Sequence, residues 1–181
     1  MEICEYAHRN QIRENGDLYL VHPCRCLGYY RHMVGIKEND PFCIDVDLME
    51  KYDIPYNGIQ ELCLLHDVIE DTDFTMEDLK EIFDECKLLD HFNMYIEKPL
   101  DIITHRKEES YDIYIDKCLK NRSAALVKMC DLNDNLDVTT LISFDDYKYD
   151  RCCRYLKYIN IINNKYHFIE NINEYHEHFL D

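Results

Sequence analysis

The chain has 181 residues, of which 46% are hydrophobic and 31% charged, a composition typical of one globular domain in water. Four glycines and four prolines exclude a collagen-like or linker-like chain and disfavour a turn-dense β-sandwich. The formal net charge of −17 argues against DNA, RNA and anionic membranes as partners, because each of these attracts basic surfaces. Residues 1–34, however, carry as many arginines as acids, so a small anionic ligand is not excluded.

The hydrophobic periodicity is helical almost throughout, and strand-like alternation is nearly absent. The pattern predicts helices over residues 2–14, 18–34, 44–53, 59–70, 110–120, 123–138 and 145–169. Asn15-Gly16-Asp17 is a turn signal, Thr75 begins a further helix with Asp78 at the capping-box position, and Pro99 marks a boundary. We therefore expect an all-α fold with a single domain over residues 1–181.

The N-terminus and the shortness of the apolar runs indicate a cytoplasmic protein. Residues 1–6 lack the charged and apolar regions of a signal peptide, and no apolar run is long enough to span a membrane. The ten cysteines should then be reduced thiols. Neither Cys24/Cys26 nor Cys152/Cys153 has the spacing of a structural zinc site, so we interpret them as small buried hydrophobic residues.

The sharpest motif is His66-Asp67-Val68-Ile69-Glu70-Asp71-Thr72. On a continuous helix, its imidazole and three carboxylates would share one face of an otherwise apolar helix. Buried charge is costly unless it is paired or bound to a metal, and an imidazole beside a carboxylate favours a divalent metal. Glu70 and Asp71 could then accept a proton from a water that the metal activates. The alternative interpretation is a solvated helix end, where acidic residues gather.

Two further motifs supply other candidate ligands. His22 stands before Pro23, and Asp131 follows an apolar run, with Asn135 one turn later. Each has a structural interpretation by itself. Two imidazoles and two carboxylates together form a mixed site that suits Mn²⁺, Fe²⁺, Mg²⁺ or Zn²⁺, and its four residues are His22, His66, Asp67 and Asp131.

The order His…His-Asp…Asp resembles that of the HD-domain metal phosphohydrolases. The resemblance is closer to the hydrolase domain of the RelA/SpoT-type alarmone enzymes and their small stand-alone relatives, and it covers roughly residues 6–138. Residues 7–23 are similar to the family's A-H-x-G-Q-x-R-K-x-G-x-P-Y-x-x-H-P, and residues 64–79 to L-L-H-D-V-x-E-D-T-x-x-T-x-E-D-L. Residues 103–115 are similar to L-T-(R/K)…Y…Y-I, and residues 127–135 to V-K-x-x-D-x-x-x-N.

The resemblance implies an HD-domain helical bundle around a central buried metal site, with C-terminal helices over 145–181. It implies that one divalent ion, usually Mn²⁺ in this family, binds the four residues named above, and that Glu70 and Asp71 position or activate the attacking water. The family reaction removes pyrophosphate from the 3′ position of guanosine tetra- or pentaphosphate. Because the chain ends at Asp181, we expect hydrolysis without synthesis.

The substrate would be a small anionic nucleotide. The resemblance implies that Arg13, Lys128 and Asn135 line its pocket, and it favours Tyr111 near the site. The arginines of the less acidic N-terminal region could bind outer phosphates through forked hydrogen bonds, with Arg9 and Arg25 as further candidates.

Three positions depart from the family pattern: Glu14 stands where Lys is frequent, Asn10 where Gly stands, and Leu18 where Pro stands. A carboxylate at position 14 would repel phosphate, and the connection over 24–58 is longer than usual. Two alternatives therefore stay open: a phosphohydrolase of another nucleotide or phosphorylated metabolite, and a non-catalytic nucleotide- or metal-binding module. A basic stripe, Arg151, Arg154 and Lys157, is either solvated or a contact in a homo-oligomer.

Overall fold

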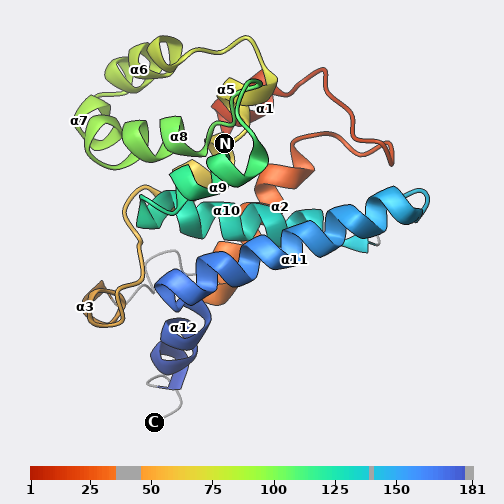
Figure 1. Ribbon diagram of the computed structural model, residues 1–181. Coiled ribbons are helices and arrows are strands. Elements are labelled where there is room, and N and C mark those ends of the chain that lie inside the picture. The colour runs from red at the N-terminus through yellow and green to blue at the C-terminus, as the bar shows by residue number, and fades with distance from the viewer. Residues whose placement is uncertain (36–45, 139–140, 178–181) are drawn as a thin grey trace.

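Helices account for the regular structure of the protein in a computed structural model that describes residues 1–35, 46–138 and 141–177 (Figure 1). Their bounds are α1 (Glu2–Ala7), α2 (Val21–Met33), α3 (Val46–Lys51), α4 (Ile59–Leu65), α5 (Val68–Asp71), α6 (Met76–Glu85), α7 (Leu89–His91), the π-helical turn η1 (Phe92–Ile96), α8 (Glu97–Ile103), α9 (Tyr111–Cys118), α10 (Arg122–Asn135), α11 (Asp146–Tyr166) and α12 (Phe168–Glu177). Within the described ranges, the β pairing is one isolated antiparallel bridge between Ile12 and Leu18. The predicted all-α fold class is confirmed.

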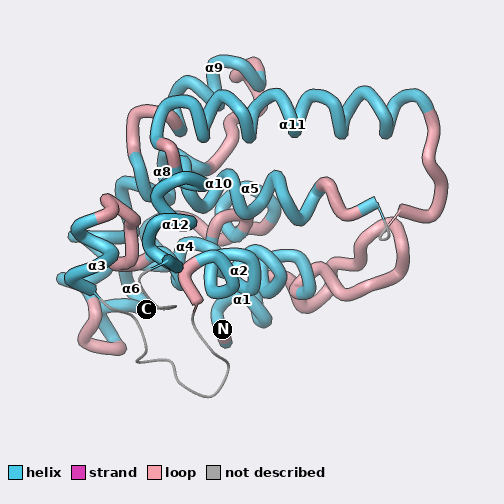
Figure 2. The backbone as a smooth tube through the Cα atoms, turned by 90° about the horizontal axis from the view of Figure 1, so that it is seen from below, coloured by secondary structure: helices cyan, strands magenta, loops and turns pink. Residues whose placement is uncertain are grey.

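Helix α10 forms the centre of the fold. Every residue from 124 to 132 is buried, including the charged Lys128 and Asp131. Helices α2 and α11 both pack against α10, and Figure 2 shows them on opposite sides of it. Helices α4 and α8 complete the surroundings of α10. A helix that is enclosed in this way must be apolar on all sides, so its few charged residues have to find partners inside the protein.

The helix predicted over residues 2–14 is wrong beyond Ala7. Residues 8–20 form a loop instead, in which the Arg13 amide donates to the Asp17 carbonyl at 2.8 Å and the Tyr19 amide donates to the Gln11 carbonyl at 3.0 Å. The predicted turn is present, since Gly16 has a φ of 90° and the Asn15 side chain accepts a hydrogen bond from the Asp17 amide. This loop runs alongside α5, because the Gln11 amide group donates to the Asp71 carbonyl at 2.5 Å.

The helix predicted over residues 59–70 is interrupted at His66 and Asp67. Helix α4 ends at Leu65 and α5 begins at Val68, and Asp67 has φ and ψ angles of −99° and −7°, outside the usual helical values. The His66 imidazole Nδ1 donates to the Cys63 carbonyl at 2.9 Å, which fixes the side chain at the break. The carboxylates of residues 67 and 71 are therefore not simply stacked along one continuous helical face.

Pro99 lies two residues after a boundary, the start of α8 at Glu97, but it does not end the run of helical turns. It is the third residue of α8, close to the junction between η1 and α8. The turn directly before α8 widens into η1, so residues 89–103 follow one another as helical turns. Proline lacks the amide hydrogen of a regular helical turn and its ring crowds the preceding turn, and the wider π-helical turn η1 before Pro99 is compatible with both effects.

The other predicted helices occur close to their expected positions. Thr75 and Asp78 form the predicted capping box before α6. The predicted 145–169 segment divides at His167, whose φ of 54° ends α11. The first two residues of the helix predicted over 44–53, and residues 36–45 of the long connection, lie outside the described residues. In the part of the chain that the structure describes, no helix is long and apolar enough to cross a membrane. The nine cysteines described there are free thiols.

Candidate metal centre

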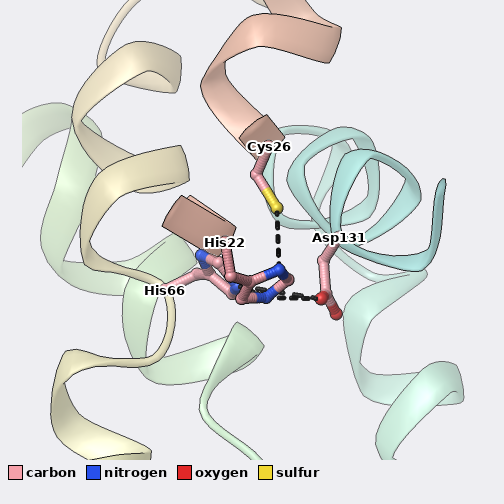
Figure 3. Close-up of side chains that lie close together, drawn as sticks. All are labelled: His22, Cys26, His66 and Asp131. Carbon is pink, nitrogen blue, oxygen red and sulfur yellow. Dashed lines mark hydrogen bonds and ion pairs between the residues drawn. The ribbon is translucent and has the colours of Figure 1, made fainter. Parts of the chain in front are cut away.

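The fold brings the four predicted metal ligands together from three elements. His22 lies in the first turn of α2, His66 and Asp67 lie at the break between α4 and α5, and Asp131 lies on α10. The His22 Nε2 atom is 3.2 Å from His66 Nε2, 3.3 Å from Asp67 Oδ2 and 3.1 Å from Asp131 Oδ1. The His66 Nε2 atom is 3.2 Å from Asp67 Oδ2 and 3.8 Å from Asp131 Oδ1. Figure 3 shows three of these side chains converging on one point.

These separations fit a shared divalent ion. Ligand atoms that each lie about 2.0–2.2 Å from one ion lie roughly 3 to 3.6 Å from one another. The donor set of two imidazole nitrogens and two carboxylates suits a first-row divalent metal. Both histidines and Asp131 are buried, so the convergence of their polar atoms requires a compensating cation or protons.

A hydrogen bond at Nδ1 of each imidazole ring determines that Nε2 faces the centre. His22 Nδ1 lies 2.6 Å from Asp134 Oδ2, and His66 Nδ1 lies 2.9 Å from the Cys63 carbonyl oxygen. Both partners only accept hydrogen bonds, so each Nδ1 carries the proton. The lone pairs of the two Nε2 atoms are then directed at the centre, which is the arrangement found for metal-ligating histidines.

The electrostatics of the cluster favour positive charge at its centre. Burial by itself would lower the pKa of His22 and His66, but the aspartates around them raise both pKa values well above the ordinary value. Burial would raise the pKa of Asp67 and Asp131, yet the imidazoles, together with Lys128 for Asp131, hold both pKa values well below the ordinary value. The same field that retains protons here also stabilises a metal cation.

Cys26 lies beside this cluster, and Figure 3 places its sulfur above the His22 ring. The sulfur is 3.9 Å from His22 Nδ1, the nitrogen that faces away from Asp67 and Asp131. Burial raises the pKa of the Cys26 thiol, which disfavours the thiolate that metals bind. Asp67, whose carboxylate approaches both Nε2 atoms, therefore completes the donor set better than Cys26.

The two predicted catalytic carboxylates have different surroundings. Glu70 Oε2 accepts a hydrogen bond from the His105 amide at 2.9 Å, and burial raises the pKa of Glu70. The Asp71 carboxylate lies 2.5 Å from the Tyr19 hydroxyl, which is also 2.7 Å from Asp67 Oδ2. Burial and these two carboxylates raise the pKa of Tyr19, so it remains a neutral phenol. Tyr19 thus links a predicted water-positioning residue to a predicted metal ligand.

Lys128 and Asn135 both contact Asp131. Lys128 Nζ donates to Asp131 Oδ2 at 2.6 Å, and Asn135 Nδ2 donates to Asp131 Oδ1 at 2.6 Å. The Lys128 ammonium also lies 5.5 Å from the centre of the Tyr111 ring and 4.8 Å from that of Tyr114. These three predicted substrate residues therefore lie on one side of the candidate metal centre, and two of them hold the predicted ligand Asp131 in place.

The predicted arginines lie on the loop over residues 8–20 and on α2. Arg13 Nη1 is 3.1 Å from Asp134 Oδ2, and Arg25 Nε is 2.5 Å from Asp134 Oδ1. Arg9 lies over the Tyr6 ring, 3.9 Å from its centre. The structure pairs Glu14, expected to repel phosphate, with the buried Lys148 ammonium at 2.8 Å, which neutralises its charge.

Two clefts reach Glu70 and Asp71 from different sides. The larger, about 750 Å³, is lined by one basic residue, Arg9, and by six carboxylates, which belong to Glu70, Asp71, Asp73, Asp78, Glu81 and Glu85. The smaller, about 340 Å³, adds one carboxylate, Glu108, and the basic side chains of Lys107 and of Arg106, which also pairs with Asp101, together with His105. The smaller cleft is therefore the better entrance for an anionic group.

Comparison with known proteins identifies the fold. No family model matches the sequence. Among solved structures, the chain is similar to one described as a metazoan ortholog of SpoT that hydrolyses ppGpp and plays a role in starvation responses. The TM-score is 0.60 and the sequence identity 20%, over 98% of this chain and 93% of that chain. The chain has the HD-domain fold. The predicted bundle around a buried His/Asp cluster is thereby confirmed.

Sequence reasoning missed two residues that organise this HD-fold site. Asp134 was not singled out, although it lies one turn from Asp131 on the same apolar helix, which is a signal for a buried partner. Tyr19 lies within residues 7–23, which carry part of the family resemblance, three residues before His22, but the sequence alone assigns it no role. In both cases the contact partner lies more than 40 residues away in the sequence, so local patterns do not reveal it.

Proposed function

We propose that the protein is a metal-dependent phosphohydrolase that removes the 3′-pyrophosphate from guanosine tetra- or pentaphosphate. The observation that carries the proposal is the convergence of two imidazole nitrogens, 3.2 Å apart, with two carboxylates that each lie 3.1–3.8 Å from both nitrogens. The similarity in fold to a ppGpp hydrolase supports this substrate over others. His22, His66, Asp67 and Asp131 are the proposed ligands, and Mn²⁺ is the proposed ion.

The bound ion would supply Lewis acidity, which neutralises charge on the scissile phosphate and lowers the pKa of the attacking water. Glu70 is the proposed general base. Its Oε2 is engaged by the His105 amide, so Oε1 is the atom that receives the water proton. The raised pKa of Glu70 makes it a stronger base than a glutamate with the ordinary pKa. Asp71, held by the Tyr19 hydroxyl, orients the water.

The substrate would lie between the metal centre and the basic residues around it. Arg106 and Lys107 line the smaller cleft and would attract the phosphates as they approach Glu70. Arg9 and Arg13 on the loop over 8–20 are the proposed contacts on the opposite side, together with Lys128, Asn135 and Tyr111. Arg13 retains donors beyond the single Nη1 contact with Asp134, since a guanidinium has five N–H groups.

The six carboxylates of the larger cleft favour a second candidate, a phosphohydrolase whose substrate carries fewer charges than guanosine tetraphosphate. A highly charged nucleotide would be repelled from that side of Glu70 and Asp71. A less charged nucleotide or phosphorylated metabolite could occupy both clefts. This candidate uses the same metal ligands and the same base, so a substrate panel separates the two.

The test is pyrophosphate and phosphate release with Mn²⁺, from guanosine tetraphosphate beside a panel of other nucleotides. Asp67→Ala and Glu70→Gln serve as inactive controls, and Asp116→Asn, an exposed change on α9, serves as a matched surface control. We expect pyrophosphate release from the tetraphosphate, lost in both site variants and retained in the surface variant. If only another member of the panel is hydrolysed, that compound replaces guanosine tetraphosphate as the proposed substrate. Mn²⁺ binding without turnover of any member would refute the proposal that the protein is an enzyme.

A further inference from the structure

Asp134 is a buried carboxylate that no step of the proposed reaction uses. It lies on α10 one turn after Asp131, on the side that packs against α2, and its side chain is fully inaccessible to solvent. Three cationic or donor groups converge on it. Oδ2 accepts from His22 Nδ1 at 2.6 Å and from Arg13 Nη1 at 3.1 Å, and Oδ1 accepts from Arg25 Nε at 2.5 Å. Arg25 Nη2 adds a weaker contact to Oδ2 at 3.3 Å.

The two arginines explain how a fully buried carboxylate can remain ionised. An isolated carboxylate at this depth would be too costly and would take up a proton. Arg25 approaches from α2 and Arg13 from the loop over residues 8–20, so both guanidinium charges come from outside α10. Charge-assisted hydrogen bonds of this kind are short and strong. Asp134 is therefore available as a charged acceptor for the His22 ring.

The two ligand histidines are held by different kinds of acceptor. The His66 ring donates to a neutral backbone carbonyl, that of Cys63, at 2.9 Å, whereas the His22 ring donates to a carboxylate at 2.6 Å. A charged acceptor on Nδ1 makes the opposite nitrogen a stronger donor to a metal and fixes the ring orientation. Of the two imidazoles, His22 is thus the one whose strength as a ligand depends on a removable side chain.

We propose that Asp134 is a positioning residue of the metal centre. It holds His22 with the proton on Nδ1 and Nε2 directed at the ion, and it ties Arg13 and Arg25 to the same point. The inference rests on the metal site of the proposed function and extends it to a residue that touches neither the ion nor the substrate. Its consequence is that the affinity for the ion depends on the Asp134 carboxylate, which α10 supplies to His22 on α2.

The first experiment is Mn²⁺ binding to the full chain by titration calorimetry in the absence of substrate. Asp134→Ala should weaken the affinity by about 10- to 100-fold, the usual effect of removing the hydrogen-bond partner of a metal-ligating histidine. Asp134→Asn retains an oxygen that can accept from Nδ1, so its loss should be smaller and it rescues part of the affinity. Asp116→Asn removes one exposed carboxylate and should leave the affinity unchanged.

A second measurement detects the ring itself. In the Zn²⁺-loaded protein, nitrogen-15 NMR should find the His22 proton on Nδ1 in a strong hydrogen bond, and this signal should weaken in Asp134→Ala while that of His66 stays. If Asp134→Ala fails to fold, Asp134→Asn provides both measurements. Affinity within about twofold of the unmodified chain in both Asp134 variants, or an unchanged His22 signal, would overturn the proposal. Neither readout involves the substrate, so failure of the proposed hydrolysis is distinguished from failure of this inference.

Discussion

The buried pair of Lys128 and Asp131 allows a quantitative prediction about stability without metal. Lys128 Nζ lies 2.6 Å from Asp131 Oδ2, and the two side chains are 10% and 6% exposed. Lys128→Met keeps the length of the aliphatic chain against the rings of Tyr111 and Tyr114 but removes the ammonium. Asp131 then keeps its contacts with the Asn135 amide and the His22 ring but loses the Lys128 ammonium, its cationic partner on α10.

Removing one partner of a buried ion pair typically destabilises a protein by about 3–5 kcal/mol, because the other charge is left uncompensated. The two remaining contacts of Asp131 favour the lower end, about 3 kcal/mol. For a chain of this length each kcal/mol lowers the melting temperature by about 2–4 °C, so Lys128→Met should lower it by roughly 6–12 °C in the presence of a chelator. Saturating Mn²⁺ should reduce the difference, since an ion beside Asp131 replaces the lost charge.

The assay is thermal unfolding followed by circular dichroism, with chelator and with Mn²⁺, for the unmodified chain, Lys128→Met, Asp131→Asn and the double variant. The double variant should be more stable than the sum of the single losses predicts, because neither charge is left alone. A melting temperature of Lys128→Met within about 2 °C of the unmodified chain in chelator would refute the argument that this pair is electrostatically essential.

Three further predictions concern protons, catalysis and the backbone. The raised pKa values of His22 and His66 stabilise the metal-free fold below about pH 6.5, and this stability is lost as the pH rises through those raised values. Because a metal replaces the imidazole protons, Mn²⁺ binding should release at least one proton and should be tighter at higher pH. Calorimetry in buffers of different ionisation enthalpy would measure the proton release. Glu70→Gln should lower kcat by about 10²- to 10⁴-fold and leave the Mn²⁺ affinity unchanged. In the unmodified protein, the pKa that governs the fall of kcat at low pH should lie above the ordinary glutamate pKa of 4.5. Equal kcat in the variant would exclude Glu70 as the base. Gly58→Ala should lower the melting temperature more than Gly16→Ala. Both glycines have a positive φ, but a Cβ at position 58 would lie 2.9 Å from another side chain, whereas a Cβ at position 16 would meet open space. Equal losses in melting temperature would contradict the steric argument.

The candidate metal centre could be proposed from the sequence because its residues are concentrated in short motifs. His66 and Asp67 are adjacent, and His22 and Asp131 stand in recognisable surroundings, so residue type and order were enough to propose one site. The geometry around those motifs was not predictable in the same way. The break at His66 depends on a hydrogen bond from its own ring to the Cys63 carbonyl, which competes with the helix and which hydrophobic periodicity does not register.

The supporting residues were harder to predict because their partners come from distant segments. Asp134 is separated from His22 by 112 residues and Tyr19 from Asp71 by 52. On a helix as uniformly buried as α10, every polar residue needs a partner, but the sequence does not say which segment supplies it. Glu14 illustrates the same point in reverse: its charge suggested repulsion of phosphate until the fold paired it with Lys148 on α11.

The charges around the site show how a chain with a net charge of −17 could act on the anionic substrate proposed for it. Three aspartates surround or support the candidate metal centre, of which two are buried and Asp67 is partly exposed, and three cationic side chains contact the two buried ones; they are Asp67, Asp131 and Asp134, and Lys128, Arg13 and Arg25. These six charges cancel, and the acids elsewhere lie largely in water, where salt screens them within about 10 Å. The field at the reacting phosphate is then determined by the ion, by Glu70 and Asp71, and by the basic side chains of the smaller cleft. Increasing the salt concentration should weaken substrate affinity because it screens this attraction, and replacing Arg106 and Lys107 together by Gln should raise KM with little change in kcat, as steady-state kinetics would measure.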